Sequence, residues 1–290
     1  MNDVAATAAA WRAQGRAAAV VTVTATRGSV PREAGTRMLV AADGAVHGTI
    51  GGGHLEFSAI ALARELLAGP AGDASPAAGG VIQRRFALGP SLGQCCGGEV
   101  HLRIAPLAAD DPAAWPLPPP RFVLQLYGAG HVGRAIARLL ATLPCRVRWL
   151  DERETEFPAD PGPPHIRRIA SDDLPGEVAG APPGAVHLVL THSHALDLAI
   201  VHAVLARGDS GFLGLIGSRS KRARFEHRLR ERGIPPAALE RLVCPIGLPG
   251  IAGKEPEVIA LAVVAQLMQL DGPGAVAGRH AAASAGQEGA

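Results

Sequence analysis

Aromatic residues, cysteines and long apolar runs are scarce in this chain of 290 residues. Phenylalanine, tryptophan and tyrosine make up only 3% of the sequence, which argues against the stacking surfaces that bind single-stranded nucleic acid. The formal net charge of +2 also argues against nucleic acid or anionic membranes as main partners. Because no apolar run reaches the roughly 18 residues that span a bilayer, we expect no membrane-spanning helix.

The 4 cysteines are too few for a disulfide framework and fit a reducing compartment. Residues 1–7 lack the basic region that opens a signal peptide. Both observations predict a cytoplasmic protein. Lysine is rare as well: 28 residues are lysine or arginine, and only Lys221 and Lys254 are lysines. We attribute that bias to genomic composition.

A proline-rich segment at 106–120 predicts a linker, since proline removes backbone donors and fixes φ. It separates an N-terminal domain at 1–105 from a C-terminal domain at 121–271. Residues 272–290 are rich in glycine, alanine and serine, and this composition predicts a disordered tail.

The N-terminal domain shows short, alternating strands and one helix, a pattern typical of a small α+β domain. Asp43 and Gly44 form a strong hairpin signal between two of the strands. The expected strands lie at 18–26, 37–41, 45–50, 81–86 and 98–105, and the expected helix lies at 55–68.

The C-terminal domain alternates apolar strands with helices, which predicts a Rossmann-like, doubly wound parallel sheet. The overall fold class is therefore α/β with a smaller α+β domain in front. The expected strands lie at 122–127, 146–150, 186–191, 212–216 and 242–246. The expected helices lie at 131–142, 196–207, 219–232 and 256–270.

Gly128, Gly130 and Gly133 form a G-x-G-x-x-G turn between the first strand and the first helix of this domain. The glycines permit a tight turn, and the helix that begins near His131 would offer its N-terminus to a pyrophosphate. We therefore predict that NAD(P) or another phosphate-bearing nucleotide binds here. The alternative is a turn that only packs the helix on the strand.

Asp151 ends the next strand, near the spacing of about 20 residues expected for a ribose-binding acid. It favours a free 2′-hydroxyl over a 2′-phosphate, although Arg153 close by weakens that choice.

Polar residues follow two further strands of the predicted sheet, at the edge where ligands of open α/β sheets bind. Thr191, His192 and His194 follow one strand, and Gly217, Ser218 and Arg219 follow the next. We assign all six to the cofactor crevice. Helix capping is the alternative role for the two histidines, which have no carboxylate or thiolate at metal-ligand spacing.

Three consecutive glycines, Gly51, Gly52 and Gly53, precede a helix that carries His54 and Glu56. Such a run predicts an anion-binding nest of backbone amides, and a tight structural corner is the alternative.

Arg32 follows a nearby proline and could present its guanidinium to a phosphate. An ion pair with Glu33 or another acid is the alternative of similar weight.

Cys95 and Cys96 stand side by side, with Gln94 before them and two glycines after them. Adjacent cysteines make a strained disulfide, and flanking glycines allow a close approach to a ligand. The thiols could be soft-metal ligands, redox thiols or persulfide carriers, or small buried side chains. A structural zinc site would have to recruit His54 or His101.

Five segments together resemble the XdhC/CoxI family, and within it the bacterial xanthine dehydrogenase accessory proteins. They are Gly-Ser-Val-Pro-Arg-Glu-Ala-Gly at 28–35, Gly-Thr-Ile-Gly-Gly-Gly-His-Leu-Glu at 48–56, Leu-Gly-Gln-Cys-Cys-Gly-Gly at 92–98, Thr-His-Ser-His-Ala-Leu-Asp at 191–197 and Leu-Ile-Gly-Ser-Arg-Ser-Lys-Arg-Ala-Arg-Phe at 215–225. The run at 245–257 agrees, so the resemblance covers roughly residues 18–270.

The resemblance implies a chaperone without turnover of its own. Such a protein binds the molybdenum cofactor (molybdopterin), protects it while a cysteine desulfurase supplies the terminal sulfur, and delivers it to xanthine dehydrogenase. Cys95 and Cys96 would then ligate molybdenum or relay sulfur. A homodimer is left open.

Two other readings of the same residues remain. The first is an NAD(P)-dependent oxidoreductase that uses His192 or His194 as a proton relay. The second is a scaffold whose Rossmann site holds nothing. Neither of them needs the adjacent cysteines.

Overall fold

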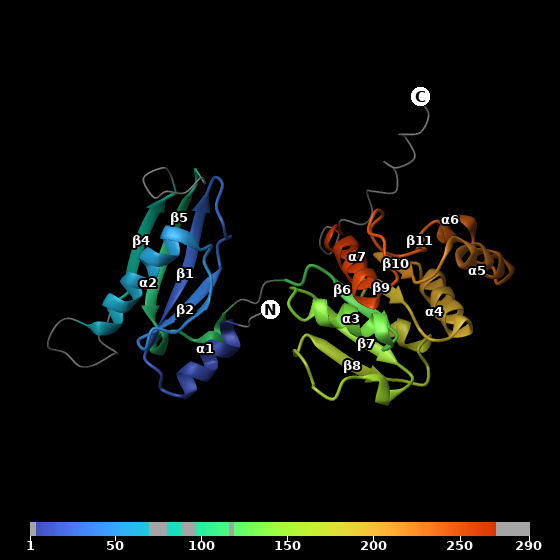
Figure 1. Ribbon diagram of the computed structural model, residues 1–290, viewed down its shortest axis with the longest axis horizontal. Helices are drawn as coiled ribbons and strands as arrows, with labels where there is room; N and C mark the ends of the chain where they lie inside the picture. The colour runs from blue at the N-terminus through green and yellow to red at the C-terminus, as the bar shows by residue number, and fades with distance from the viewer. Residues whose placement is uncertain (1–3, 70–79, 89–96, 116–118, 271–290) are drawn as a thin grey trace, which may run out of the picture. The chain divides into compact units, whose positions relative to one another are not determined.

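The computed structural model describes residues 4–69, 80–88, 97–115 and 119–270, and the chain forms two compact units (Figure 1). The first unit spans residues 2–117 and the second spans residues 118–290. Each has its own sheet and its own hydrophobic core.

The N-terminal unit contains a five-stranded sheet in the order β3-β2-β1-β5-β4, with every neighbouring pair antiparallel. The Asp43-Gly44 hairpin is confirmed, because Gly44 has a φ of 94° and Asp43 accepts a hydrogen bond from the Ala45 amide. The strands are β1 (Ala18–Arg27), β2 (Arg37–Ala41), β3 (Val46–Gly48), β4 (Ile82–Ala87) and β5 (Glu99–Pro106).

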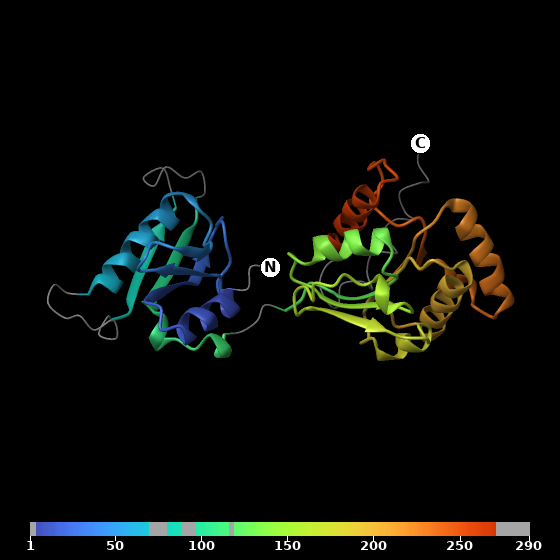
Figure 2. The ribbon, with the colours of Figure 1, turned by 60° about the horizontal axis from the view of Figure 1, so that its bottom comes forward.

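Two helices cover opposite faces of this sheet (Figure 2). Alternate residues of a strand point to opposite faces. Val21 of β1 therefore packs in the core under α2 (Gly53–Ala68), while Val20 packs in the core under α1 (Val4–Ala13). Helix α1 was not expected from the sequence, because its alanine-rich residues show no clear apolar periodicity.

The structure differs from the predicted linker over Pro106–Trp115. These residues end β5 and form two short 3₁₀ helices, Leu107–Ala109 and Pro112–Ala114. Leu107 and Trp115 are buried in the core under α1, and the Trp115 indole donates a hydrogen bond to Asp110. A proline at the first position of a 3₁₀ turn costs no hydrogen bond, so the prolines here do not prevent packing.

The C-terminal unit contains a six-stranded parallel sheet in the order β11-β10-β9-β6-β7-β8. Numbered within the unit, this is the 3-2-1-4-5-6 order of dinucleotide-binding folds, and it confirms the predicted α/β class. The strands are β6 (Val123–Tyr127), β7 (Arg146–Asp151), β8 (Ile166–Ala170), β9 (Val186–Val189), β10 (Phe212–Leu215) and β11 (Leu242–Val243).

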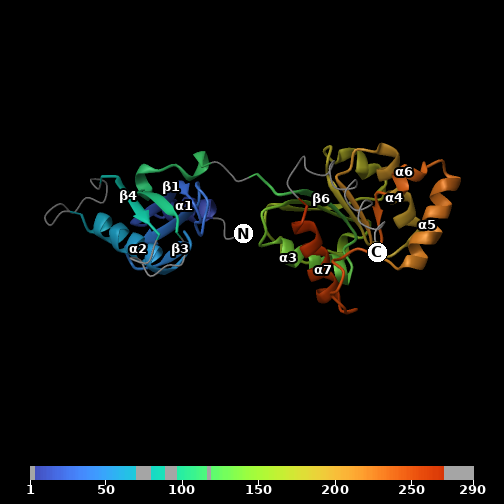
Figure 3. The same ribbon diagram turned by 90° about the horizontal axis from the view of Figure 1, so that it is seen from above.

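Helices cover both faces of the parallel sheet (Figure 3). On one face α3 and α7 pack over Leu124 and Leu126 of β6, and on the other face α4 and α5 pack over Tyr127. The helices are α3 (His131–Leu140), α4 (His194–Arg207), α5 (Arg219–Glu231), α6 (Pro236–Leu239) and α7 (Pro256–Met268).

Strand β8 was not expected, because only Ile166 among its five residues is buried. The crossover from β7 to β8 holds the 3₁₀ turn Glu154–Glu156 in place of an α-helix. Within the described residues, no helix is long and apolar enough to cross a membrane.

Candidate functional site

The glycine-rich turn lies at the carboxyl end of β6, where the order of the sheet reverses. Strand β7 pairs with β6 on one side and β9 pairs with it on the other. Ligands of open α/β sheets bind at such a switch point.

The three glycines of the turn differ in the space around them. A side chain at Gly128, whose φ is 119°, would meet the Leu190 carbonyl oxygen at 2.4 Å. A side chain at Gly133 would meet the Gly128 carbonyl oxygen at 2.1 Å, so that glycine brings helix α3 close to the turn. Gly130 has nothing within 4 Å of an added Cβ. The space beside the backbone is therefore open at Gly130.

The N-terminus of α3 adds hydrogen-bond donors at that open space. Gly130 is the N-cap residue and has no side chain to cap the helix. The structure gives its amide no acceptor among the described residues, and the first amides of a helix have no partner within it. His131 is exposed as the first helical residue. The turn thus offers backbone donors and the positive end of a helix dipole to an anion.

Asp151 does not present a free carboxylate to this site. Its Oδ2 accepts a hydrogen bond of 2.6 Å from the Ala129 amide, and its Oδ1 accepts bonds of 3.0 Å from both the amide and Nε of Arg153. Burial alone would raise the pKa of Asp151, but the bonds from Arg153 and Ala129 outweigh it and hold the pKa below its ordinary value. Asp151 therefore fixes the turn against the end of β7.

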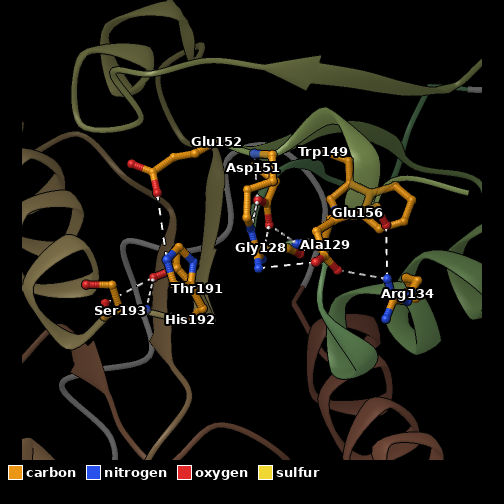
Figure 4. Close-up of polar contacts among 11 residues, drawn as sticks. Gly128, Ala129, Arg134, Trp149, Asp151, Glu152, Glu156, Thr191, His192 and Ser193 are labelled. Atoms are coloured by element: carbon orange, nitrogen blue, oxygen red, sulfur yellow. Dashed lines mark hydrogen bonds and ion pairs between the residues drawn. The ribbon is translucent and has the colours of Figure 1, made fainter.

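Thr191, His192 and Ser193 follow the end of β9 beside the turn, and His192 points toward Glu152 (Figure 4). The His192 Nε2 lies 4.0 Å from a carboxylate oxygen of Glu152, at the end of β7. Ser193, rather than either histidine, caps α4 by accepting a hydrogen bond from the Leu196 amide. His194 is the exposed first residue of that helix.

A buried ion pair that the sequence analysis did not assign lies behind this edge. Lys221 Nζ donates to Asp197 Oδ2 at 2.7 Å and to the Ile216 carbonyl at 2.8 Å. Asp197 also accepts hydrogen bonds from the amide and hydroxyl of Thr191. The pair therefore ties the ends of β9 and β10 together. Lys221 is one of only two lysines in a chain rich in arginine, and that rarity is the sequence signal for it, which the attribution to genomic composition overlooks.

Gly217 makes room for that lysine, because an added Cβ would lie 2.6 Å from the Lys221 Cδ. Ser218 caps α5 by accepting a hydrogen bond from the Lys221 amide. Arg219 is exposed beside it, with no partner among the described residues.

Two of the three amides in the Gly51–Gly53 run of the N-terminal unit already have partners within the chain: Gly51 donates to the Thr49 hydroxyl and Gly52 donates to Glu56. All three glycines have positive φ. The Glu56 Oε2 accepts hydrogen bonds from the Thr49 hydroxyl at 2.5 Å, the Ile50 amide at 3.2 Å and the Gly52 amide at 3.1 Å. An incoming phosphate would have to displace this carboxylate, whereas His54 next to it is exposed.

Three motif segments of the N-terminal unit meet at this end of the sheet. A side chain at Gly51 would lie 2.4 Å from Pro31, and one at Gly98 would lie 2.2 Å from the Ser29 carbonyl oxygen. Arg32 is exposed and has no ion-pair partner among the described residues, so the alternative of a pair with Glu33 or another acid is not seen there.

Gln94, Cys95 and Cys96 lie outside the described residues, and their assigned roles stay predictions. The two cysteines that are described, Cys145 and Cys244, are buried and free. Burial raises the pKa of Cys145 to about 11 and also raises that of Cys244, which keeps both thiols protonated and unreactive near neutral pH. The described ranges contain no group of three or more histidine, cysteine or acidic side chains that could hold a metal.

Comparison with known proteins agrees with the family resemblance. The family model described as the XdhC Rossmann domain matches residues 124–267, and the model of the XdhC and CoxI family matches residues 11–72. The uncharacterised protein YqeB of Escherichia coli K12 is 30% identical over 259 residues. That alignment covers 87% of this chain but only 43% of YqeB, so the chain spans less than half of that relative.

A solved structure described as a xanthine dehydrogenase from Bacillus halodurans shares the fold. It has a TM-score of 0.65 and 20% identity, and the match covers 93% of this chain and 96% of that one. The two family models, one on each structural unit, show that this chain belongs to the XdhC and CoxI family.

Proposed function

We propose that this chain is an accessory protein that binds the molybdenum cofactor, protects it during sulfuration by a cysteine desulfurase, and delivers it to xanthine dehydrogenase. Family membership supports the accessory role. The observation that carries the binding role is the open space at Gly130, beside an uncapped helix N-terminus.

The residues of the turn fit the phosphate end of a pterin cofactor. The Gly130 amide and the N-terminus of α3 would hold the phosphate, because they offer donors that nothing in the described chain uses. The bound cofactor would supply the molybdenum centre that receives the sulfur. We assign Cys95 and Cys96 to contact with that centre, since thiolates are soft ligands and nucleophiles.

Co-production of xanthine dehydrogenase with and without this chain tests the proposal. We expect the enzyme made with the chain to carry more cyanide-labile sulfur and to be more active. Serine at both Cys95 and Cys96 should abolish that gain. Serine at the buried Cys145 is the matched control and should keep it. Equal sulfur loading with and without the chain would contradict the accessory role.

An NAD(P)-dependent oxidoreductase is the second candidate, because the exposed His192 lies at the same edge as the open turn. Hydride transfer from NADH by the isolated chain, at ordinary enzyme rates, would favour it. We expect no such turnover, and no turnover on purines.

A further inference from the structure

The crossover between β7 and β8 leaves part of the parallel sheet without a covering helix. Parallel strands are usually joined by an α-helix that packs on the sheet, as α3 does between β6 and β7 (Figure 1). Because such crossovers are right-handed, a helix between β7 and β8 would lie on the same face as α3. Residues 152–165, all of them in the described part of the chain, hold only the 3₁₀ turn Glu154–Glu156.

A cavity of about 330 Å³ lies at this place, between α3 and the strands β7 and β8. Trp149 lines it from β7 and Ile166 lines it from β8. Four further lining residues lie three or four positions apart on one face of α3 and its C-cap: Arg134, Ala137, Arg138 and Ala141. The volume is within the range of roughly 300–1,000 Å³ that is typical of small-molecule sites.

The remaining wall of the cavity is the segment 158–163, which the chain holds in place. Arg168 of β8 donates hydrogen bonds to the Pro158 carbonyl, at 2.6 Å, and to the Asp160 carbonyl. The Asp160 carboxylate accepts a hydrogen bond of 3.1 Å from the Gly162 amide. This wall is therefore formed by contacts within the chain and does not need a ligand to order it.

The apolar part of the lining suits a flat ring. Ala137 and Ala141 leave the α3 side of the cavity without long side chains. Trp149 is buried and packs edge-on against Phe157, with ring centroids 5.2 Å apart. Aromatic side chains favour offset or edge-on contact with another ring, and Ile166 adds apolar surface beside Trp149.

The charged part of the lining suits a single negative charge. Arg134 is paired with Glu156 (Figure 4), and Arg168 donates to the two carbonyls of the wall. Arg138 instead pairs with Glu257 at the surface, where the two side chains are 65% and 69% exposed.

An ion pair as exposed as Arg138–Glu257 contributes little free energy, so another carboxylate can replace Glu257 at small cost. Asp160 is the acid in the lining, and its charge would repel a doubly charged group more strongly than a singly charged one. The cavity therefore favours a carboxylate over a phosphate.

We propose that this cavity binds a planar aromatic carboxylate. The ring lies against Trp149 and Ile166, and Arg138 binds the carboxylate. The site goes beyond the cofactor role, because none of the three glycines of the Rossmann turn, all of them described, lines the cavity.

Calorimetric titration of the full chain with indole-3-carboxylate and with its neutral amide tests this assignment. We expect the wild type to bind the carboxylate about tenfold more tightly than the amide, the effect of one charge-assisted hydrogen bond. Arg138→Met should bind the carboxylate about tenfold more weakly than the wild type does and should bind the amide equally well. The preference for the carboxylate should therefore disappear in this variant.

Two further variants locate the site. Ala137→Leu places a larger side chain in the cavity and should abolish binding of both compounds. Arg230→Met is the matched control: it removes an exposed arginine that pairs with Glu226 and lies outside the cavity, and it should change neither affinity.

Three results would overturn the assignment: no saturable binding of indole-3-carboxylate by the wild type, a carboxylate preference that survives in Arg138→Met, or wild-type affinity in Ala137→Leu. If the melting temperature shows that Ala137→Leu does not fold, the comparison of the two compounds in Arg138→Met decides alone. The accessory role is scored separately, by the sulfur content of co-produced xanthine dehydrogenase.

Discussion

The two glycine-rich turns of this protein differ in how much of their donor capacity the chain itself uses. In the N-terminal unit, one carboxylate oxygen of Glu56 accepts hydrogen bonds from the Thr49 hydroxyl and from the Ile50 and Gly52 amides. In the C-terminal unit, Asp151 takes only the Ala129 amide, and Gly130 stays open. Glycine-rich turns of similar sequence therefore differ in how many of their backbone donors the chain itself uses. An acid in the first turn of the following helix marks the one that the chain fills.

The largest loss of stability should come from a side chain placed inside the Rossmann turn. We expect Gly133→Val to destabilise the C-terminal unit by about 3 kcal/mol or more, because the new Cβ would lie 2.1 Å from the Gly128 oxygen. Urea unfolding followed by tryptophan fluorescence measures the loss. Wild-type stability in this variant would show that α3 can move away at little cost.

Breaking the buried Lys221–Asp197 pair should lower the free energy of unfolding by nearly as much. Lys221→Met leaves the Asp197 carboxylate, which is 0% exposed, without its cation, and we expect a loss of about 3 kcal/mol. The matched control is Arg138→Met, which removes an exposed partner of Glu257 and should cost below about 0.5 kcal/mol. A Lys221→Met, Asp197→Leu double variant more stable than Lys221→Met alone would support the pair as the cause.

Acid should weaken the C-terminal unit in particular. Burial is the main reason that the pKa of His187 falls to about 4, from an ordinary value near 6.5. Because the folded state disfavours protonation of His187, the stability that depends on neutral His187 is complete above pH 6.5 and is lost as the pH falls toward 4. It amounts to about 3 kcal/mol.

Unfolding measured from pH 7 to 4 checks this, with His187→Gln as the comparison. The pH dependence should be shallower in the variant. Parallel curves would assign the acid sensitivity to other groups.

Weakening the Glu56 contacts of the N-terminal unit should cause a moderate loss of stability. Glu56→Gln replaces a charged acceptor of three hydrogen bonds, and we expect a loss of about 1–2 kcal/mol. Dinucleotide binding should not change, since the Rossmann turn belongs to the other unit. A stable variant would mean that a water or the amide oxygen replaces the carboxylate in full.

The smallest effect on stability should accompany a large effect on binding. We expect Gly130→Val to change the free energy of unfolding by less than about 0.5 kcal/mol, because nothing lies within 4 Å of the new Cβ. Calorimetry with NAD⁺ should nevertheless show at least a tenfold loss of affinity. Equal affinity in wild type and variant would mean that Gly130 has no role in binding.

Much of the fold could be predicted because it depends on local pattern. The alternating strands of the N-terminal unit and the apolar strands of the parallel sheet were expected within a few residues of their observed bounds. Strand β8 and helix α1 were missed, since neither has a periodic apolar face. The burial of Trp115 was not predicted, because the prolines around it indicated a linker.

The sequence by itself determined the α/β class, the positions of the glycine-rich turns and membership of the XdhC and CoxI family. Only the tertiary structure decided which side chains those turns meet. It showed that Asp151 holds the turn while Glu152 lies beside His192, and that Lys221 reaches Asp197. These contacts join residues from different strands and helices. They depend on sheet order and register, which the periodicity of a single segment does not specify.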